Sequence, residues 1–145
     1  MKKDSSHKNI LNATVLSELY EIGIALTSNI ELAEILELVG ESARQVLVAD
    51  RAVCHLYNQA SNQYTLATDL GKKLLPKLIR RPRENGPTAT IVKSGIPLIS
   101  NDAQYEDTPY RDSPFTKAAN VQSVIGLPLK KANEIVGVLY INYHK

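Results

Sequence analysis

The sequence VQSVIGLPLKKANEIVGVLYINYHK, residues 121–145, contains two apolar runs that are rich in β-branched side chains. Val121–Leu129 and Ile135–Tyr143 are separated by the polar loop Lys130–Glu134. This pattern predicts an antiparallel β-hairpin. The segment Ile135–Ile141 is apolar on both faces of the strand, so both faces of the sheet should be covered. We therefore expect helices on one face and a second layer, where a small ligand would lie, on the other.

The composition is that of a globular protein with one domain. The 145 residues suffice for a single core, and the apolar and charged fractions, 43% and 22%, are ordinary. The net charge of +2 does not indicate a nucleic-acid or membrane partner. One cysteine excludes an internal disulfide framework and a cysteine-cluster metal site. No apolar run is long enough to cross a membrane and no signal peptide is recognisable, so we expect a cytoplasmic protein.

Two amphipathic helices are expected before the first strand. Residues 1–9 are polar and are expected to be flexible. Apolar side chains recur every three or four positions over residues 10–27. A capping box formed by Ser28 and Glu31 starts a second helix over residues 29–48. The face of this helix that should pack on the core carries Leu32, Ile35, Leu36, Val39, Ala43, Val46 and Leu47.

Strands and short helices alternate along the next part of the chain. A hairpin is expected from Arg51–Tyr57 and Gln63–Asp69, with a polar turn between them. A short helix over Leu70–Arg81 should follow the hairpin. The next helix, over Pro87–Ser94, has proline at its first position and Gly95 at its C-cap.

The segment before the closing hairpin is less regular. Pro97–Ser100 is expected to form a short strand, and Asn101–Ala119 is a polar stretch with one helical turn near Phe115. The order is two helices, a hairpin, an irregular insertion and a second hairpin. This order predicts an α+β layered fold, in a single domain over residues 1–145.

Several short passages of the sequence match one known family when they are taken in order. They are Ala49–Ala52, Gly86–Thr88, Val92–Leu98, Asn101–Asp102, Ser123–Leu129 and Ile135–Leu139. Together they resemble the GAF domain, a regulatory relative of the PAS fold, over nearly the whole chain. The specific part is a helix followed by Ser-Gly-x-Pro-Leu and an aspartate, and then a hairpin with Ser-x-x-x-x-Pro-Leu and Val-Gly-Val-Leu.

The resemblance implies a central antiparallel sheet of five to six strands. The N-terminal helices would cover one face, and short helices and loops would form a pocket on the other. It also implies a sensory or dimerising module of a larger signalling protein, such as a two-component sensor kinase, a cyclase, a phosphodiesterase or a transcription regulator. Family members bind cyclic nucleotides, tetrapyrroles, haem, small ions or amino acids, and some bind nothing, so the cofactor stays unknown.

The signatures of ligand-specific groups within the family are incomplete in this chain. Members that bind cyclic nucleotides carry an acidic pair after a phenylalanine, whereas the residues after Phe115 include no acid before Asn120. Members that bind bilins attach them to a cysteine in the irregular region, whereas Cys54 lies in the first strand and is expected to be a buried core residue. His55 is more typical of a packing residue than of a haem or metal ligand.

No catalytic motif is found. The family's free-methionine-sulfoxide reductases need several cysteines, and this chain has one. It has no glycine-rich phosphate loop, no paired HxxxH metal motif and no GxSxG elbow. We therefore expect a domain that is not an enzyme.

Six basic residues and no acid lie between Gly71 and Arg83. They form either the solvated face of a short helix or a lid that faces an anionic ligand, with Arg80 and Arg81 as candidate contacts. The start of the helix at Pro87, with its free backbone N–H groups, is a second candidate anion site. The predicted partner is an unidentified small molecule, and an anion is one candidate.

Seven tyrosines and one phenylalanine, without tryptophan, suit a pocket that is apolar yet offers hydroxyl groups. Ordinary packing at strand ends is the alternative for each of them. Asp102 adds polar specificity, unless it caps a local turn. The candidate pocket residues are Tyr57, Tyr64, Arg80, Arg81, Thr88, Asp102, Tyr105, Tyr110, Phe115, Ser123 and Tyr140.

The first helix carries Val15, Leu19, Ile22 and Leu26 at the 4-3-4 spacing of a coiled-coil seam. The resemblance favours this seam as a homodimer interface, and packing on the chain's own sheet is the alternative. The leading interpretation is a sensory domain that binds a small molecule, without a nucleic-acid or membrane partner. The alternative is a ligand-free dimerisation module, whose pocket would be filled by its own aromatic side chains.

Overall fold

The computed structural model of the protein describes residues 15–17, 19, 31–71 and 82–144. The chain divides into two units, Met1–Ile35 and Leu36–Lys145. In the first unit, residues 15–17 and 19 are helical, and the side chains of Val15 and Leu19 are exposed.

Parts of the sequence predictions fall outside the described residues. These parts are the flexible start over residues 1–9, the seam residues Ile22 and Leu26, and residues 72–81 of the predicted short helix. The fold described below is that of the second unit.

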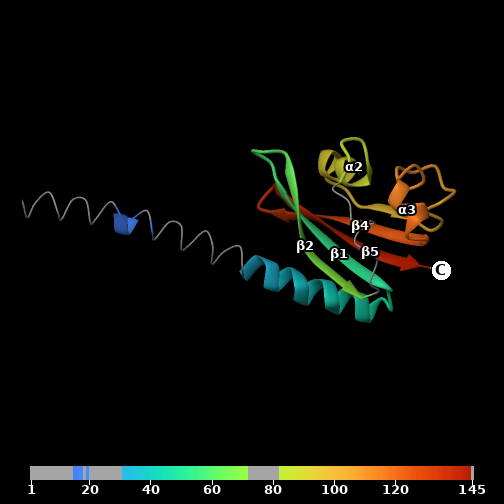
Figure 1. Ribbon diagram of the computed structural model, residues 1–145, viewed down its shortest axis with the longest axis horizontal. Helices are drawn as coiled ribbons and strands as arrows, with labels where there is room; N and C mark the ends of the chain where they lie inside the picture. The colour runs from blue at the N-terminus through green and yellow to red at the C-terminus, as the bar shows by residue number, and fades with distance from the viewer. Residues whose placement is uncertain (1–14, 18, 20–30, 72–81, 145) are drawn as a thin grey trace, which may run out of the picture. The chain divides into compact units, whose positions relative to one another are not determined.

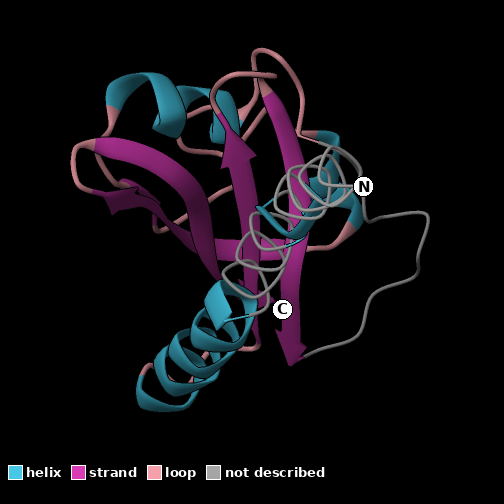
Figure 2. Ribbon diagram, turned by 90° about the vertical axis from the view of Figure 1, so that its left-hand side faces the viewer, coloured by secondary structure: helices cyan, strands magenta, loops and turns pink. Residues whose placement is uncertain are grey.

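Five strands form one antiparallel sheet in the order β2-β1-β5-β4-β3 within the described residues (Figures 1 and 2). They are β1 Arg51–Asn58, β2 Gln63–Gly71, β3 Leu98–Ser100, β4 Val121–Lys131 and β5 Glu134–His144. Each neighbouring pair is antiparallel. The α+β class and the central sheet that the sequence predicts are thus confirmed. The predicted helix over residues 70–81 starts too early, because Leu70 and Gly71 continue β2 and pair with β1.

The closing hairpin is longer than the sequence pattern suggests. β4 and β5 pair as far as Lys131 and Glu134, so the connection consists of Ala132 and Asn133 rather than five residues. Ala132 adopts a φ of 55°, in the left-handed region that lets a short turn reverse the chain. The lysines and Glu134 therefore belong to the strands, where exposed polar side chains extend the ladder beyond the apolar runs.

Two short helices, α2 Pro87–Ser94 and α3 Pro114–Ala118, begin with proline. Proline suits the first helical position because it lacks the N–H group that would have no partner there. At the end of α2, Gly95 has a φ of 67° and donates its N–H to the carbonyl of Ile91, as a left-handed C-cap does. The bounds of α2 agree with those predicted, and α3 is the predicted helical turn near Phe115.

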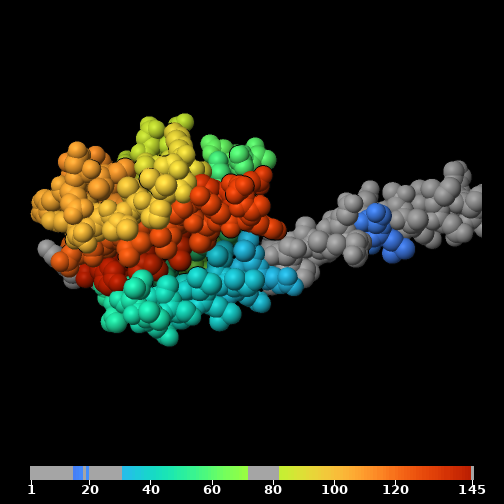
Figure 3. Space-filling model, turned by 180° about the vertical axis from the view of Figure 1, so that it is seen from behind, coloured from blue at the N-terminus to red at the C-terminus, as the bar shows by residue number. Residues whose placement is uncertain are grey.

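The two faces of the sheet are covered by different elements. A helix spans residues 31–46, and its part in the second unit, residues 36–46, lies on one face of the sheet. The elements α2 and α3 lie on the opposite face (Figures 1 and 3). No helix of the described residues is long and apolar enough to cross a membrane.

Small residues bring residues 36–46 close to the sheet. A Cβ atom on Gly40 would lie 3.3 Å from Leu70 Cδ1 and 3.8 Å from Ala52 Cβ. Leu36 and Gly40 are buried, whereas Val39, Leu47 and Val46 (81% exposed) are not. The core-facing side predicted for this helix is therefore wrong in part, because a glycine that permits close packing carries no hydrophobic signal.

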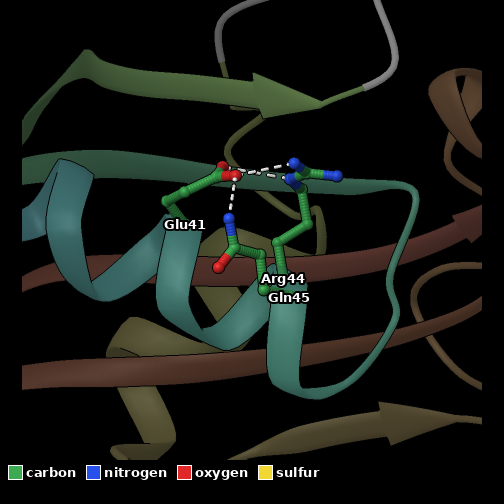
Figure 4. A network of polar contacts seen from close by, with 3 residues as sticks. All are labelled: Glu41, Arg44 and Gln45. Carbon is green, nitrogen blue, oxygen red and sulfur yellow. Dashed lines mark hydrogen bonds and ion pairs between the residues drawn. The ribbon is translucent and has the colours of Figure 1, made fainter.

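Polar contacts fix the end of this helix. Glu41 accepts hydrogen bonds from Arg44 Nη2 at 2.7 Å and Gln45 Nε2 at 3.1 Å (Figure 4). Beyond the helix, the hydroxyl of Tyr143 donates to the carbonyl of Leu47 at 2.7 Å. The last turn of the helix is thereby bonded to the end of β5.

Gly137 offers a test of how closely β1 and β5 approach. A Cβ atom there would lie 2.7 Å from the backbone oxygen of His55, a contact that no small movement of a side chain relieves. We expect Gly137→Ala to lower the free energy of unfolding by about 1–3 kcal/mol, measured by urea denaturation. The matched control is Gly86→Ala, whose Cβ would meet no atom closer than 3.5 Å. Equal stability of the two variants would contradict this account.

Candidate functional site

A cavity of about 140 Å³ lies against the face of the sheet that α2 and α3 cover. Its size suits a guest of about six non-hydrogen atoms, since a cavity of ~150 Å³ accommodates benzene. The sheet contributes Arg51, Val53, His55, Leu66, Val121, Val124, Tyr140 and Asn142. The helices and connections contribute Pro82, Arg83, Gly86, Pro87, Thr88, Tyr110, Ser113, Pro114, Phe115 and Thr116.

Arg51 is the buried charge of the site. Its side chain is 2% exposed and forms a two-pronged ion pair with Asp69. Nε donates to Asp69 Oδ1 and Nη2 donates to Asp69 Oδ2, both at 2.7 Å. The guanidinium carbon lies 5.3 Å from the ring centroid of Phe115, where the aromatic face attracts a cation. β1, β2 and α3 are therefore joined through one side chain.

Two buried polar atoms beside the cavity have no hydrogen-bond partner among the described residues. They are Nη1 of Arg51 and Oδ1 of Asn142. Arg51 and Asn142 are direct cross-strand partners in the pairing of β1 with β5, and both line the cavity. A buried donor or acceptor without a partner costs about 1–3 kcal/mol. A guest that supplies an acceptor to Arg51 would remove that cost.

Hydroxyl groups form the wall toward α2. Thr88 Oγ1 and the Tyr140 hydroxyl lie 2.6 Å apart, and either can donate. The Tyr110 hydroxyl donates to the carbonyl of Leu98 at 2.7 Å. Burial raises the pKa of both tyrosines well above the usual range, so both are neutral donors. Gly126 makes this packing possible, because a Cβ atom there would lie 2.5 Å from Ile91 Cδ1 and from the Tyr110 hydroxyl.

His55 and Cys54 lie on opposite faces of β1, as successive strand residues do. His55 lines the cavity, with its ring centroid 6.3 Å from that of Tyr140. Burial, and the nearby Arg51 charge, lower the pKa of His55 to about 4, so the ring is neutral at pH 7. Cys54 is fully buried and does not line the cavity. Burial raises the pKa of its thiol to about 11, which agrees with the expected role in the core.

The structure distributes the predicted pocket residues over several places. Thr88, Tyr110, Phe115 and Tyr140 come together around the cavity. Tyr57 and Tyr64 instead line a separate surface groove, with ring centroids 5.0 Å apart. This groove is larger, about 570 Å³, but half of its lining residues are exposed and none of the described residues that line it has a buried unpartnered polar atom.

The other predicted pocket residues do not line the cavity. Asp102 and Tyr105 are exposed, and Ser123 is half-buried on β4. Asp102 O accepts the N–H groups of Tyr105 and Glu106, as in a local turn. Arg80 and Arg81 lie outside the described residues, so the predicted lid stays a prediction.

The central residues that sequence reasoning missed are Arg51, His55 and Asn142. An arginine at the start of an apolar strand is usually solvated, so the residue type alone did not indicate that Arg51 belongs to the site. A signal did exist in the hairpin, because Arg51 and Asp69 are the charged residues near the paired ends of two apolar strands. Among the described residues, no three of His, Cys, Asp and Glu are grouped to hold a metal ion.

The lowered pKa of His55 predicts a dependence of stability on pH. Between pH 6.5 and 4 the unfolded chain binds a proton at His55 that the folded protein does not bind. The free energy of unfolding should therefore fall as the pH falls through this window, by at most about 1.4 kcal/mol per pH unit, and His55 should contribute no slope above it. Urea denaturation at several pH values measures the slope. His55→Gln should flatten it, and an identical slope in both proteins would refute the assignment.

Cys54 should be unreactive in the native protein. Its thiol is buried and its pKa is raised, so little thiolate is available to a disulfide reagent at neutral pH. We expect labelling by a chromogenic disulfide to need unfolding, and to proceed at once in urea. Rapid labelling of the folded protein would show that β1 opens to solvent.

The comparisons with known proteins agree with this architecture. No curated protein matches the chain. Among solved structures, a NreA protein from Staphylococcus aureus, mutated in its nitrate-binding site, is similar with a TM-score of 0.63 and 22% identity. That match covers 80% of this chain and 87% of NreA.

Two further solved structures are similar. The GAF domain of a phosphoenolpyruvate-protein phosphotransferase from Coxiella burnetii has a TM-score of 0.63 and 21% identity, over 79% of this chain and 68% of that one. A free methionine-R-sulfoxide reductase from Neisseria meningitidis has a TM-score of 0.61 and 18% identity, over 77% and 63%. The sequence profile of the GAF domain, GAF_2, matches residues 29–145. The chain therefore belongs to the GAF domain family.

Proposed function

We propose that this domain is a non-catalytic sensory domain of a larger signal-transduction protein, and that it binds a small molecule in the cavity between the sheet and the helices α2 and α3. The observation that carries this proposal is the pair of unpartnered buried atoms, Arg51 Nη1 and Asn142 Oδ1, beside the cavity. Each costs stability that an apolar side chain would not cost, and a guest with complementary polar groups would recover it.

Two structural neighbours support a cavity that holds a small molecule. NreA has a nitrate-binding site, and the Neisseria reductase was solved in complex with its substrate. The identities are low, so these likenesses establish the fold, and the guest of this chain follows from its own residues.

The absence of enzymatic activity is also part of the proposal. The neighbouring reductase is an enzyme, but Cys54, the one cysteine of this sequence, is buried away from the cavity and is kept as a thiol. His55, the histidine of the cavity, is neutral and has no carboxylate bonded to its ring among the described residues. Neither side chain is placed as an activated nucleophile or base.

A ligand-free dimerisation module is the second candidate. In its favour, Leu38, Val39 and Val46 are exposed apolar side chains on the helix over residues 31–46, and Leu47 is exposed directly after it. The exposed Val15 and Leu19 suit the homodimer seam proposed for the first helix. A dimer and a sensor are compatible, so oligomeric state alone does not choose between the two functions.

The proposed sensory function is tested by releasing any bound small molecule from the protein. The purified full chain is denatured, and the small molecules that appear are identified by mass spectrometry. Leu66, which lines the cavity and is 41% exposed, is replaced by tryptophan to occupy part of the space. We expect the released compound to be retained by the wild type and to be lost from Leu66→Trp.

Ile99→Trp is the matched control, because Ile99 is 56% exposed on β3 and does not line the cavity. It should retain the compound. The wild-type sequence has no tryptophan, so the fluorescence of the introduced indole reports directly on whether the new ring is shielded from solvent. Equal retention in both variants would place the guest elsewhere. A chain that carries no compound and whose melting temperature no class of small molecule shifts would favour the ligand-free module.

A further inference from the structure

The chemistry around the cavity restricts the kind of guest. Arg51 is a permanently charged donor whose Nε and Nη2 are used by Asp69, while Nη1 has no acceptor among the described residues. Nη1 carries two N–H bonds, and burial denies them water. The natural complement is an oxygen acceptor, and a negatively charged one forms the stronger hydrogen bond.

The start of α2 adds a second, independent attraction for negative charge. Gly86, Pro87 and Thr88 line the cavity at the N-terminal end of this eight-residue helix. The N-cap Gly86 offers no side-chain cap, and no acidic residue lies in the first turn. The backbone N–H groups of this turn and the positive end of the helix dipole are therefore not neutralised by those side chains.

The charges of the lining point the same way. Among the described residues, the charged residues of the lining are Arg51 and Arg83, and no Asp or Glu belongs to it. Arg83 is exposed and uses Nη2 to bond the backbone oxygen of Asp112, so its charge remains at the rim. Asp69 balances the charge of Arg51 but is not itself part of the lining. A cationic guest would meet two guanidinium groups and no carboxylate.

Beside its charged and hydroxyl groups, the lining also has an apolar part. Val53 and Val124 on the sheet face Phe115 and the prolines of the two helix starts. A small inorganic anion would leave this surface uncovered, whereas a guest of about six non-hydrogen atoms matches the volume of the cavity. The guest needs one charged end and a short apolar body.

We infer that the guest is a small aliphatic monocarboxylate, whose carboxylate accepts hydrogen bonds from Arg51 and whose hydrocarbon part lies against Val53, Val124 and Phe115. This inference rests on the proposed sensory function and names the chemical class that the same cavity takes. Asn142 Oδ1, the unpartnered acceptor beside Arg51, is available to a hydroxyl group on such an acid.

The test uses butyrate as the probe with the purified full chain. Butyrate, butyramide, butylammonium and nitrate are compared at constant ionic strength by calorimetric titration and by the shift in melting temperature. Butyrate should bind, and butyramide and butylammonium should bind at least about tenfold more weakly, because the charged acceptor is lost or reversed. Nitrate should also bind more weakly, because it covers none of the apolar wall.

Variants connect the binding to Arg51. Arg51→Lys should weaken butyrate binding about tenfold or more, since a point charge does not reproduce the guanidinium fork. Asp69→Asn should strengthen it, because the competing carboxylate is removed while Arg51 stays charged. Arg83→Gln should weaken it by a smaller, salt-dependent factor. The matched control is Arg111→Gln, an exposed arginine paired with Asp107 outside the lining, which should leave the affinity unchanged.

The outcomes separate this inference from the proposed function. Equal affinity for butyramide and butyrate, or tighter binding of nitrate, overturns the carboxylate and leaves a sensory cavity with another guest. A fall in affinity with Asp69→Asn also overturns it, and this variant serves where Arg51→Lys does not fold. If no monocarboxylate binds, the inference is overturned. The release experiment tests the proposed function independently of this result.

Discussion

The two-pronged ion pair between Arg51 and Asp69 is the interaction on which the rest of this face depends. Removing one partner of a buried ion pair costs about 3–5 kcal/mol, because it leaves an uncompensated buried charge. Asp69 satisfies one edge, and the ring of Phe115 lies over the group. The pair joins the edge strand β2 to β1 and ties α3 to the sheet. The remaining edge of the guanidinium, with Nη1, gives the cavity its donor for an anionic or polar guest.

β5 connects the cavity face of the sheet to the face that residues 36–46 cover. It lies between β1 and β4, and its side chains alternate between the two faces of the sheet. Tyr140 and Asn142 face the cavity, while the Tyr143 hydroxyl bonds the carbonyl of Leu47 where the preceding helix ends. The N–H of His144 donates to Asp50 Oδ2 at 2.8 Å. The cavity and the end of the helix over residues 31–46 therefore contact neighbouring residues of one strand, β5, and only a few covalent bonds of that strand separate them.

Much of the fold could be predicted because its signals are local. Proline at the start of α2, glycine at its end and the paired β-branched runs each reflect a short-range constraint on the backbone. The predicted hairpin connection was too long because Ala132, rather than a glycine, takes the left-handed conformation of the short turn. The buried side of the helix over residues 31–46 was assigned from apolar spacing, whereas close approach at Gly40 decides it.

The site was harder to predict because its residues acquire their roles only in three dimensions. Tyr110, Phe115 and Tyr140 were found from the general suitability of aromatic and hydroxyl groups for a pocket, and Thr88 from its place at the start of a helix. Arg51 was not, because a buried arginine becomes understandable only once strand pairing brings Asp69 beside it. Asp102 and Tyr105 were chosen by proximity in the sequence to an irregular segment, and the chain folds them outward.

The cavity is lined partly by strands and partly by the connections between them. This division affects how the specificity of such a domain can change in evolution. The buried polar groups proposed to meet a guest, Arg51 and Asn142, lie on β1 and β5, the strands held by neighbours on both sides, whereas most of the remaining wall, with Arg83 at its rim, comes from residues 82–88 and 113–116. Substitutions in connections change the free energy of folding little, and those in buried strands change it much. A new guest of the same charge is thus accessible through a few mutations outside the sheet. A guest of opposite charge would require the core to be rebuilt.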